Sequence, residues 1–112
     1  VYVKNNILYA KSGNAYVSNS GGNNTNINLD TNLYFGASAS SAGSYTDSHP
    51  RFANPLLVSP YSNLHLQVSS PAINAGLSLG NDASGQPLSG ASDIDGNPRV
   101  TGSAINIGAH EL

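Results

Sequence analysis

The sequence contains no cysteine, methionine or tryptophan, and only 9% of its 112 residues are charged. The absence of cysteine excludes disulfide bonds and thiolate metal sites. No apolar run approaches the roughly 20 residues that a membrane-spanning helix needs. The formal net charge of −2 gives no basic surface of the kind that binds nucleic acid or an anionic membrane.

Small polar residues take the place of charge. Asn, Ser, Thr and Gly are abundant and supply hydrogen-bonding groups that carry no charge. This composition suits hydrogen-bonded turns and neutral ligands such as sugars, and it suits equally a soluble scaffold that binds nothing. The length predicts one domain.

An internal repeat with an offset of 26 residues organises the first third of the chain. Val1–Tyr9 aligns with Ile27–Phe35, and apolar residues match at five positions. Repeats with a period between about 20 and 50 residues are typical of solenoids. Apolar and polar residues alternate with a period of two, which predicts β-strands that point Val1 and Val3 inward and Tyr2 outward.

The repeat also aligns Asn6 with Asn32, at the bend between the two predicted strands of each repeat. Stacked about 4.8 Å apart, two such amides would form a hydrogen-bonded ladder. The alternative is that the amides bind a ligand.

The other segments are assigned as strands or loops from their composition and alternation. Ala15–Val17 is predicted to be a strand, and residues 18–26 and 36–48 are loops by composition. Phe52 is expected to fill the core. A further strand is predicted at Asn63–Val68, with three apolar side chains buried: Leu64, Leu66 and Val68. No helix is predicted.

Three motifs near the end of the chain resemble one family. They are SPAINAG, DIDGNPR and NIGAHE, at Ser70–Gly76, Asp93–Arg99 and Asn106–Glu111. Together they resemble the closing segment of bacterial right-handed parallel β-helix proteins of the pectate-lyase-like type. This sequence departs from the pattern at Asn74 and Asn106, where Asp is usual, and at His110, where Tyr is usual.

The repeat and the resemblance imply an all-β fold, a right-handed parallel β-helix (solenoid). Its last coils and their loops would occupy residues 1–48, and an extended closing segment of the same domain would occupy residues 49–112. The resemblance also implies a secreted or cell-surface bacterial protein that acts on polysaccharide as a lyase or glycoside hydrolase. This piece would then supply scaffold and sugar-binding surface, with the chemistry on upstream coils. The alternative is a non-catalytic surface or adhesion protein built on the same solenoid.

No catalytic constellation is visible. A glycosidase needs two carboxylates about 5–10 Å apart across a groove, and the six carboxylates here show no such pairing in the sequence. The four Lys and Arg residues are scattered, and the three histidines lack metal-ligand spacing. We therefore do not expect this chain alone to be catalytic.

Sugar binding is predicted for outward-facing side chains: Tyr2, Tyr16, Tyr45, Tyr61 and Arg51. Arg51 would bind an acidic sugar or pair with a carboxylate.

Asp93 and Asp95 precede Gly96 at alternate positions, like the opening of a calcium-binding loop. The bidentate Glu that completes an EF-hand is missing. Capping of the turn by the same carboxylates is the alternative to calcium.

The chain opens within a predicted strand and without Met, which predicts a piece of a longer protein. Stacked repeats bury a continuous core only when roughly three are present. We therefore expect the Val1–Val17 edge to pack against upstream β-helix coils, supplied by a separate fragment or by another copy of the chain.

Overall fold

The computed structural model describes residues 1–10, 16–18, 25–36 and 45–112. Within these ranges the chain forms short strands and no helix, so the all-β prediction is confirmed for them. The predicted strand at Ala15–Val17 and the loops 18–26 and 36–48 lie partly outside the described residues. The strands are β1 (Tyr2–Lys4), β2 (Ile7–Tyr9), β3 (Asn28–Asp30), β4 (Leu33–Phe35), β5 (Arg51–Phe52), β6 (Leu57–Ser59) and β7 (Asn63–Leu66).

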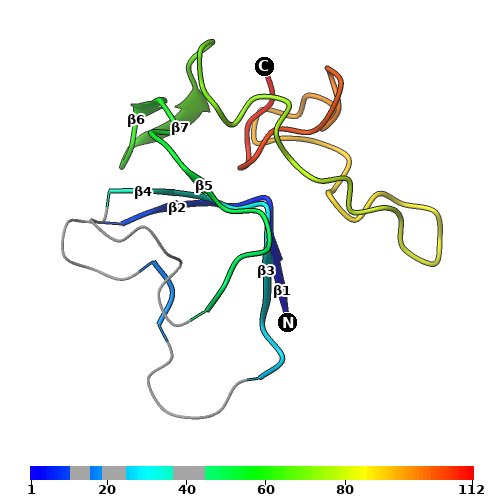
Figure 1. Ribbon diagram of the computed structural model, residues 1–112. Helices are drawn as coiled ribbons and strands as arrows, with labels where there is room; N and C mark the ends of the chain where they lie inside the picture. The colour runs from blue at the N-terminus through cyan, green and yellow to red at the C-terminus, as the bar shows by residue number, and fades with distance from the viewer. Residues whose placement is uncertain (11–15, 19–24, 37–44) are drawn as a thin grey trace.

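The N-terminal strands pair in parallel. β1 pairs with β3, with Tyr2 opposite Asn28, and β2 pairs with β4, with Ile7 opposite Leu33. Both registers match the 26-residue alignment of the sequence. β5 then adds to the other side of β4 (Figure 1). Within the described residues β1 and β2 have a partner on one side only, so packing of the Val1–Val17 edge against another segment stays a prediction.

The chain turns sharply between the paired strands at the same place in both repeats. Asn5 and Thr31 have positive φ angles of 58° and 55°. A left-handed backbone is uncommon for a β-branched residue and needs support from its surroundings. Asp47 gives that support, because its Oδ1 accepts the Thr31 N–H at 3.1 Å. The β1–β3 ribbon consequently runs at a steep angle to the β2–β4–β5 sheet (Figure 1).

Two apolar clusters lie against the β2–β4–β5 sheet. The Tyr34 cluster consists of Leu29 and Tyr34, with Val3, Leu8, Tyr16, Val17, Ile27 and Tyr45 packed around them. The Leu33 cluster consists of Leu33, Leu57, Leu66, Ala72 and Ile107, with Ile7, Tyr9, Phe35, Ile73 and Ala75 packed around them. Neighbouring residues of β2 and β4 thus alternate between the clusters, as the period of two requires.

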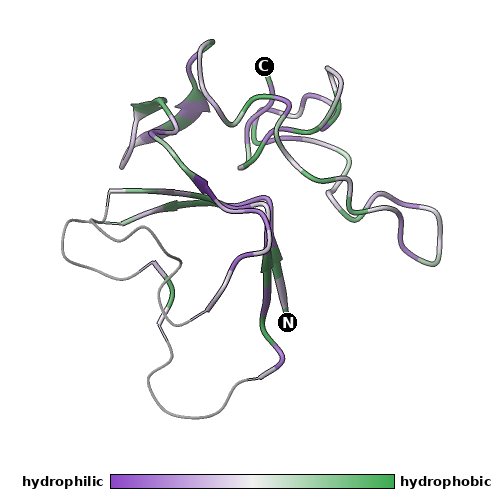
Figure 2. Cartoon of the chain, in the orientation of Figure 1, coloured by the Kyte–Doolittle hydropathy of each residue, from purple (hydrophilic) through white to green (hydrophobic). Residues whose placement is uncertain are grey.

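After β5 the parallel pairing of strands ends. β6 and β7 form an antiparallel hairpin, with Leu57 opposite Leu66. The segment that follows has isolated bridges and turns in place of strands. Figure 2 shows short hydrophobic stretches alternating with polar ones along this segment. Ile107 brings it back to the Leu33 cluster, where its side chain is fully buried.

The predicted right-handed parallel β-helix is wrong. The described residues form small sheets of two, three and two strands, one of them antiparallel, and no solenoid. The parallel register covers two turns of chain, and β5 extends it by only two residues. From there on the chain does not stack a further coil. It folds over the sheet as a hairpin and loops, in a body with a radius of gyration of 14.4 Å.

Several predicted core positions are also wrong. Leu64 and Val68 are 53% and 85% exposed, although they alternate with buried Leu66. Leu64 faces the open cavity beside Ile7, and Val68 lies beyond the end of β7. Phe52 is 43% exposed and stacks on the Tyr34 ring at 5.3 Å, covering the cluster from outside. Val1, at the end of its strand, is 76% exposed.

Candidate functional site

The structure does not gather the predicted sugar-binding side chains. Tyr2 and Tyr61 are 75% and 71% exposed but lie on β1 and in the β6–β7 turn. Tyr16 and Tyr45 are half-buried against the Tyr34 cluster, where they contribute to packing. Arg51 is exposed on β5. Of the five, Tyr2 lines a groove.

That groove has a volume of about 560 Å³ and separates β1 from the loop that follows Leu77. Tyr2 and Lys4 alternate along β1 and point to the same face. With Asn6, which follows the turn at Asn5, they form one wall. The described residues of the other wall are Ser78, Leu79 and Leu88. The groove therefore combines an aromatic ring, an ammonium group and an amide with an apolar lip. We call it the Tyr2 groove.

Charges hold the Lys4 side chain along the groove. Its Nζ lies 3.9 Å from Asp30 Oδ2 and 5.4 Å from the centre of the Tyr2 ring. Asp30 Oδ1 is in turn 2.8 Å from His49 Nδ1. The hydrogen bond with His49, aided by the charge of Lys4, lowers the pKa of Asp30. Asp30 thus stays ionised and fixes the position of the ammonium group.

The structure brings the two ladder residues together. Asn6 Nδ2 donates to Asn32 Oδ1 at 3.1 Å, and the Asn6 backbone N–H donates to the same oxygen at 3.0 Å. Asn32 is fully buried and its Nδ2 donates to Val3 O at 2.8 Å and to Asp47 Oδ2 at 2.7 Å. Asn32 is thus structural, whereas Asn6 is exposed and lines the groove.

Sequence reasoning missed Asp47, the polar centre of the parallel region. This carboxylate is 5% exposed. Within the described chain its donors are the backbone N–H groups of Thr31, Asn32 and His49, the Asn32 amide and the Tyr34 hydroxyl. Burial, followed by the bond to Asp47, raises the pKa of Tyr34. No signal in the sequence marks Asp47, because it ends a low-complexity loop.

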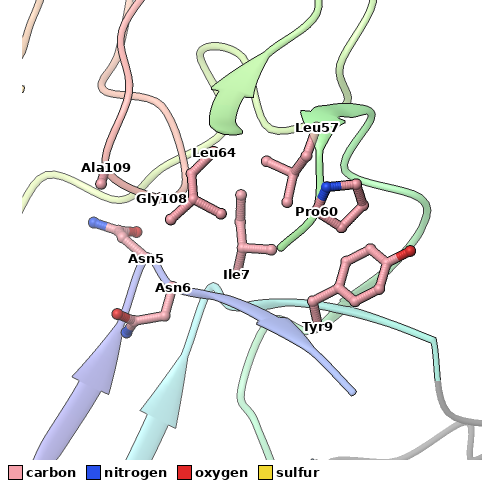
Figure 3. A pocket seen from close by; sticks show the side chains of 9 residues that line it. All are labelled: Asn5, Asn6, Ile7, Tyr9, Leu57, Pro60, Leu64, Gly108 and Ala109. Carbon is pink, nitrogen blue, oxygen red and sulfur yellow. The ribbon is translucent and has the colours of Figure 1, made fainter. Parts of the chain in front are cut away.

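A second cavity, of about 310 Å³, lies between β2 and the hairpin. Figure 3 shows Ile7 at its centre, with Leu57 and Leu64 above and Tyr9 and Pro60 to one side. Its polar wall is largely closed, because Asn5 Nδ2 donates to Leu77 O and Asn5 Oδ1 accepts the Leu77 N–H, both at 2.7 Å. This cavity offers apolar contact and suits a sugar less well than the Tyr2 groove.

The Asp93 carboxylate caps its own turn. Oδ1 accepts the backbone N–H groups of Asp95 and Asn97 at 2.9 and 2.8 Å, and Oδ2 accepts that of Glu111 at 2.9 Å. These hydrogen bonds lower the pKa of Asp93 to about 2, and the one from the Glu111 N–H has the largest effect. Asp95 faces His65 instead, with Oδ2 2.8 Å from Nε2. Calcium binding by the Asp93–Asp95 pair stays a prediction.

The closing motifs bind one another through buried polar groups. Asn106 Oδ1 accepts the Asn74 N–H at 2.7 Å, and the Asn106 N–H donates to Glu111 Oε1 at 3.0 Å. Arg99 Nη1 lies 3.3 Å from the same Glu111 oxygen, and both side chains are buried. Burial raises the pKa of Glu111. The hydrogen bond from the Asn106 N–H and the positive charge of Arg99 act in the opposite direction and lower it. These residues therefore hold the fold together.

No protein-family model, curated protein or solved structure matches the chain. The resemblance of its closing motifs to a known family stays a prediction. In the part of the chain that the structure describes, no helix is long and apolar enough to cross a membrane.

Proposed function

We propose that this chain is a carbohydrate-binding and scaffold module of a secreted or cell-surface bacterial protein, and that it binds polysaccharide in the Tyr2 groove. The observation that carries the proposal is the row of Tyr2, Lys4 and Asn6 along one wall of this groove of about 560 Å³. Ligand sites typically combine apolar walls with a few placed polar groups, and this wall has that composition.

Each group in the row has a role toward a sugar. The Tyr2 ring, 75% exposed, offers an apolar face on which the C–H face of a sugar ring can stack. Both Asn6 Nδ2 protons are engaged, by Lys4 O at 2.7 Å and by Asn32 Oδ1 at 3.1 Å. Asn6 Oδ1 is therefore left to accept a sugar hydroxyl. The Lys4 ammonium can donate to a hydroxyl or pair with the carboxylate of an acidic sugar.

The proposed role is binding rather than catalysis. None of the described lining residues is a carboxylate, and Asp30 nearby is engaged by Lys4 and His49. Hydrolysis of a glycosidic bond needs two carboxylates on opposite sides of that bond. The module would therefore present polysaccharide to catalytic groups elsewhere in a larger enzyme, or attach an adhesion protein to it.

Affinity electrophoresis through gels that contain a soluble β-glucan, a xylan or a pectin tests the proposal, followed by calorimetry on the best ligand. Tyr2→Ala should weaken binding about two- to tenfold, because loss of one aromatic contact is worth about 0.5–1.5 kcal/mol. Tyr61→Ala is the matched control, since this ring is 71% exposed and does not line the groove. It should bind like the wild type.

Two results would overturn the proposal. One is that no polysaccharide retards the wild-type chain. The other is that Tyr61→Ala weakens binding as much as Tyr2→Ala does.

A further inference from the structure

Three side chains from distant parts of the sequence meet beside the hairpin. They are His65 of β7, Asp95 in the turn after Asp93, and His110 near the end of the chain. His65 Nε2 lies 3.0 and 2.8 Å from the two Asp95 oxygens, and His110 Nε2 lies 3.6 Å from Oδ2. One potential ligand atom from each residue lies within 4.8 Å of the other two.

Hydrogen bonding fixes the proton on the His65 ring. Asn63 Oδ1 accepts the His65 backbone N–H at 3.1 Å, so this atom is the amide oxygen and can only accept. It also contacts His65 Nδ1, which must therefore carry a proton. The lone pair of the neutral ring is then on Nε2 and faces the Asp95 carboxylate. Two lone-pair groups at this distance need a positive centre between them, either a proton or a metal ion.

His110 has the opposite tautomer. Its Nδ1 accepts the backbone N–H of Leu66 at 3.0 Å in a buried position, so the proton of the neutral ring is on Nε2. That proton points toward Asp95 Oδ2, at 3.6 Å. At that distance the contact is electrostatic and not a hydrogen bond. His110 could itself bind a metal only if the Leu66 N–H lost its acceptor.

We propose that His65 Nε2 and the Asp95 carboxylate bind a divalent transition-metal ion, with Asn63 orienting the His65 ring and His110 lying beside the carboxylate. Ligating histidines commonly donate their other ring N–H to an oxygen, as His65 does to Asn63. The His65 and Asp95 side chains are partly exposed, at 38% and 40%, so water completes the coordination.

The donor set favours a transition-metal ion over calcium, and its spacing favours nickel over zinc. Imidazole suits Zn²⁺, Cu²⁺ and Ni²⁺, whereas Ca²⁺ takes oxygen ligands. Two ligands about 2.0–2.1 Å from one ion lie about 2.9 Å apart at the right angle of a tetragonal Ni²⁺ or Cu²⁺ site, and about 3.3 Å apart at the tetrahedral angle of Zn²⁺. The observed separations of 2.8 and 3.0 Å match the right-angle spacing.

The chain contains a matched control in the His49–Asp30 pair. Its closest nitrogen–oxygen distance is also 2.8 Å, but the Lys4 ammonium lies 3.9 Å from the same carboxylate. A cation beside the carboxylate disfavours a second positive ion there. The proposed site should therefore depend on His65 and not on His49.

Calorimetric titration of the chain, free of any histidine tag, with NiCl₂ and with ZnCl₂ tests the proposal. Wild type and His49→Gln should bind one ion with the same affinity, and His65→Gln should bind at least tenfold more weakly. Asp95→Asn should show the same loss, which guards against misfolding of one variant. In NMR spectra Ni²⁺ should broaden the His65 and His110 ring signals before those of His49. The absence of saturable binding below 1 mM, or equal loss in His49→Gln and His65→Gln, would overturn the proposal.

Discussion

In the parallel region, residues 1–10 and 27–36, backbone groups bond mainly to backbone groups, as where the Leu33 N–H donates to Asn6 O at 2.8 Å. In the C-terminal region, residues 53–112, many backbone N–H groups are met by side chains. Leu66 donates to His110, Asn74 to Asn106, and Glu111 to Asp93. Both regions nevertheless pack into the Leu33 cluster.

The two regions should therefore differ in how well they tolerate single substitutions. A ladder depends on register, and register follows from the pattern of apolar residues along many positions. A segment held by side-chain acceptors depends on each of those side chains, because a buried N–H without an acceptor costs about 1–3 kcal/mol. Single substitutions should therefore be felt more in the C-terminal region, except where the ladder also relies on one side chain.

Asp47 is a single side chain on which the parallel region relies, so its substitution should have the largest effect. Asp47→Ala should lower the free energy of unfolding by about 3–5 kcal/mol, because it leaves the Asn32 amide, the Tyr34 hydroxyl and backbone N–H groups buried without an acceptor. Urea denaturation followed by circular dichroism measures this change.

Asp82→Ala is the control for that substitution. Asp82 Oδ1 accepts three bonds, from the Ser84 N–H and hydroxyl and from the Gln86 N–H, but in an exposed turn. Water can replace this acceptor, so the cost should be clearly smaller. Equal costs for the two variants would contradict the role given to Asp47.

A smaller effect is expected at Asp93, and it depends on pH. Its folded pKa of about 2 is below the ordinary 3.8, so Asp93 contributes stability at higher pH that is lost as the pH falls. The melting temperature of Asp93→Asn should lie below that of the wild type by a constant amount above about pH 4. The difference should shrink between about pH 4 and pH 2. A difference that stays constant down to pH 2 would show that the charge of Asp93 is not responsible.

The sequence permitted accurate prediction of the parallel register and poor prediction of what surrounds it. The alignment of Val1–Tyr9 with Ile27–Phe35 pairs the same residues as the structure does. The same alignment did not establish a solenoid, because two matching repeats do not show whether a third repeat follows. After β5 the chain makes a hairpin and covers the sheet, which periodicity alone does not reveal.

The sites were harder to predict because they join residues that are distant in the sequence. Tyr2 was predicted to face outward, but the opposing wall, with Leu79 and Leu88, comes from a loop whose path no pattern indicated. His65 and Asp95 are 30 residues apart, so no local spacing marked them as neighbours. The resemblance placed the closing motifs in one segment, but no pattern indicated the bond between the Asn74 N–H and Asn106 Oδ1, 32 residues apart.

Amide hydrogen exchange tests most directly whether the two regions share one core. The Leu33 N–H bonds to Asn6 O at 2.8 Å, the Ile107 N–H bonds to Ala72 O at 2.9 Å, and both residues are fully buried. Their exchange should report the same free energy of opening, that of global unfolding, whereas Gly85 and Gly90 in exposed turns should exchange by local fluctuation. Exchange of Ile107 long before Leu33 would contradict a shared core and would make the C-terminal region a separate, weaker unit.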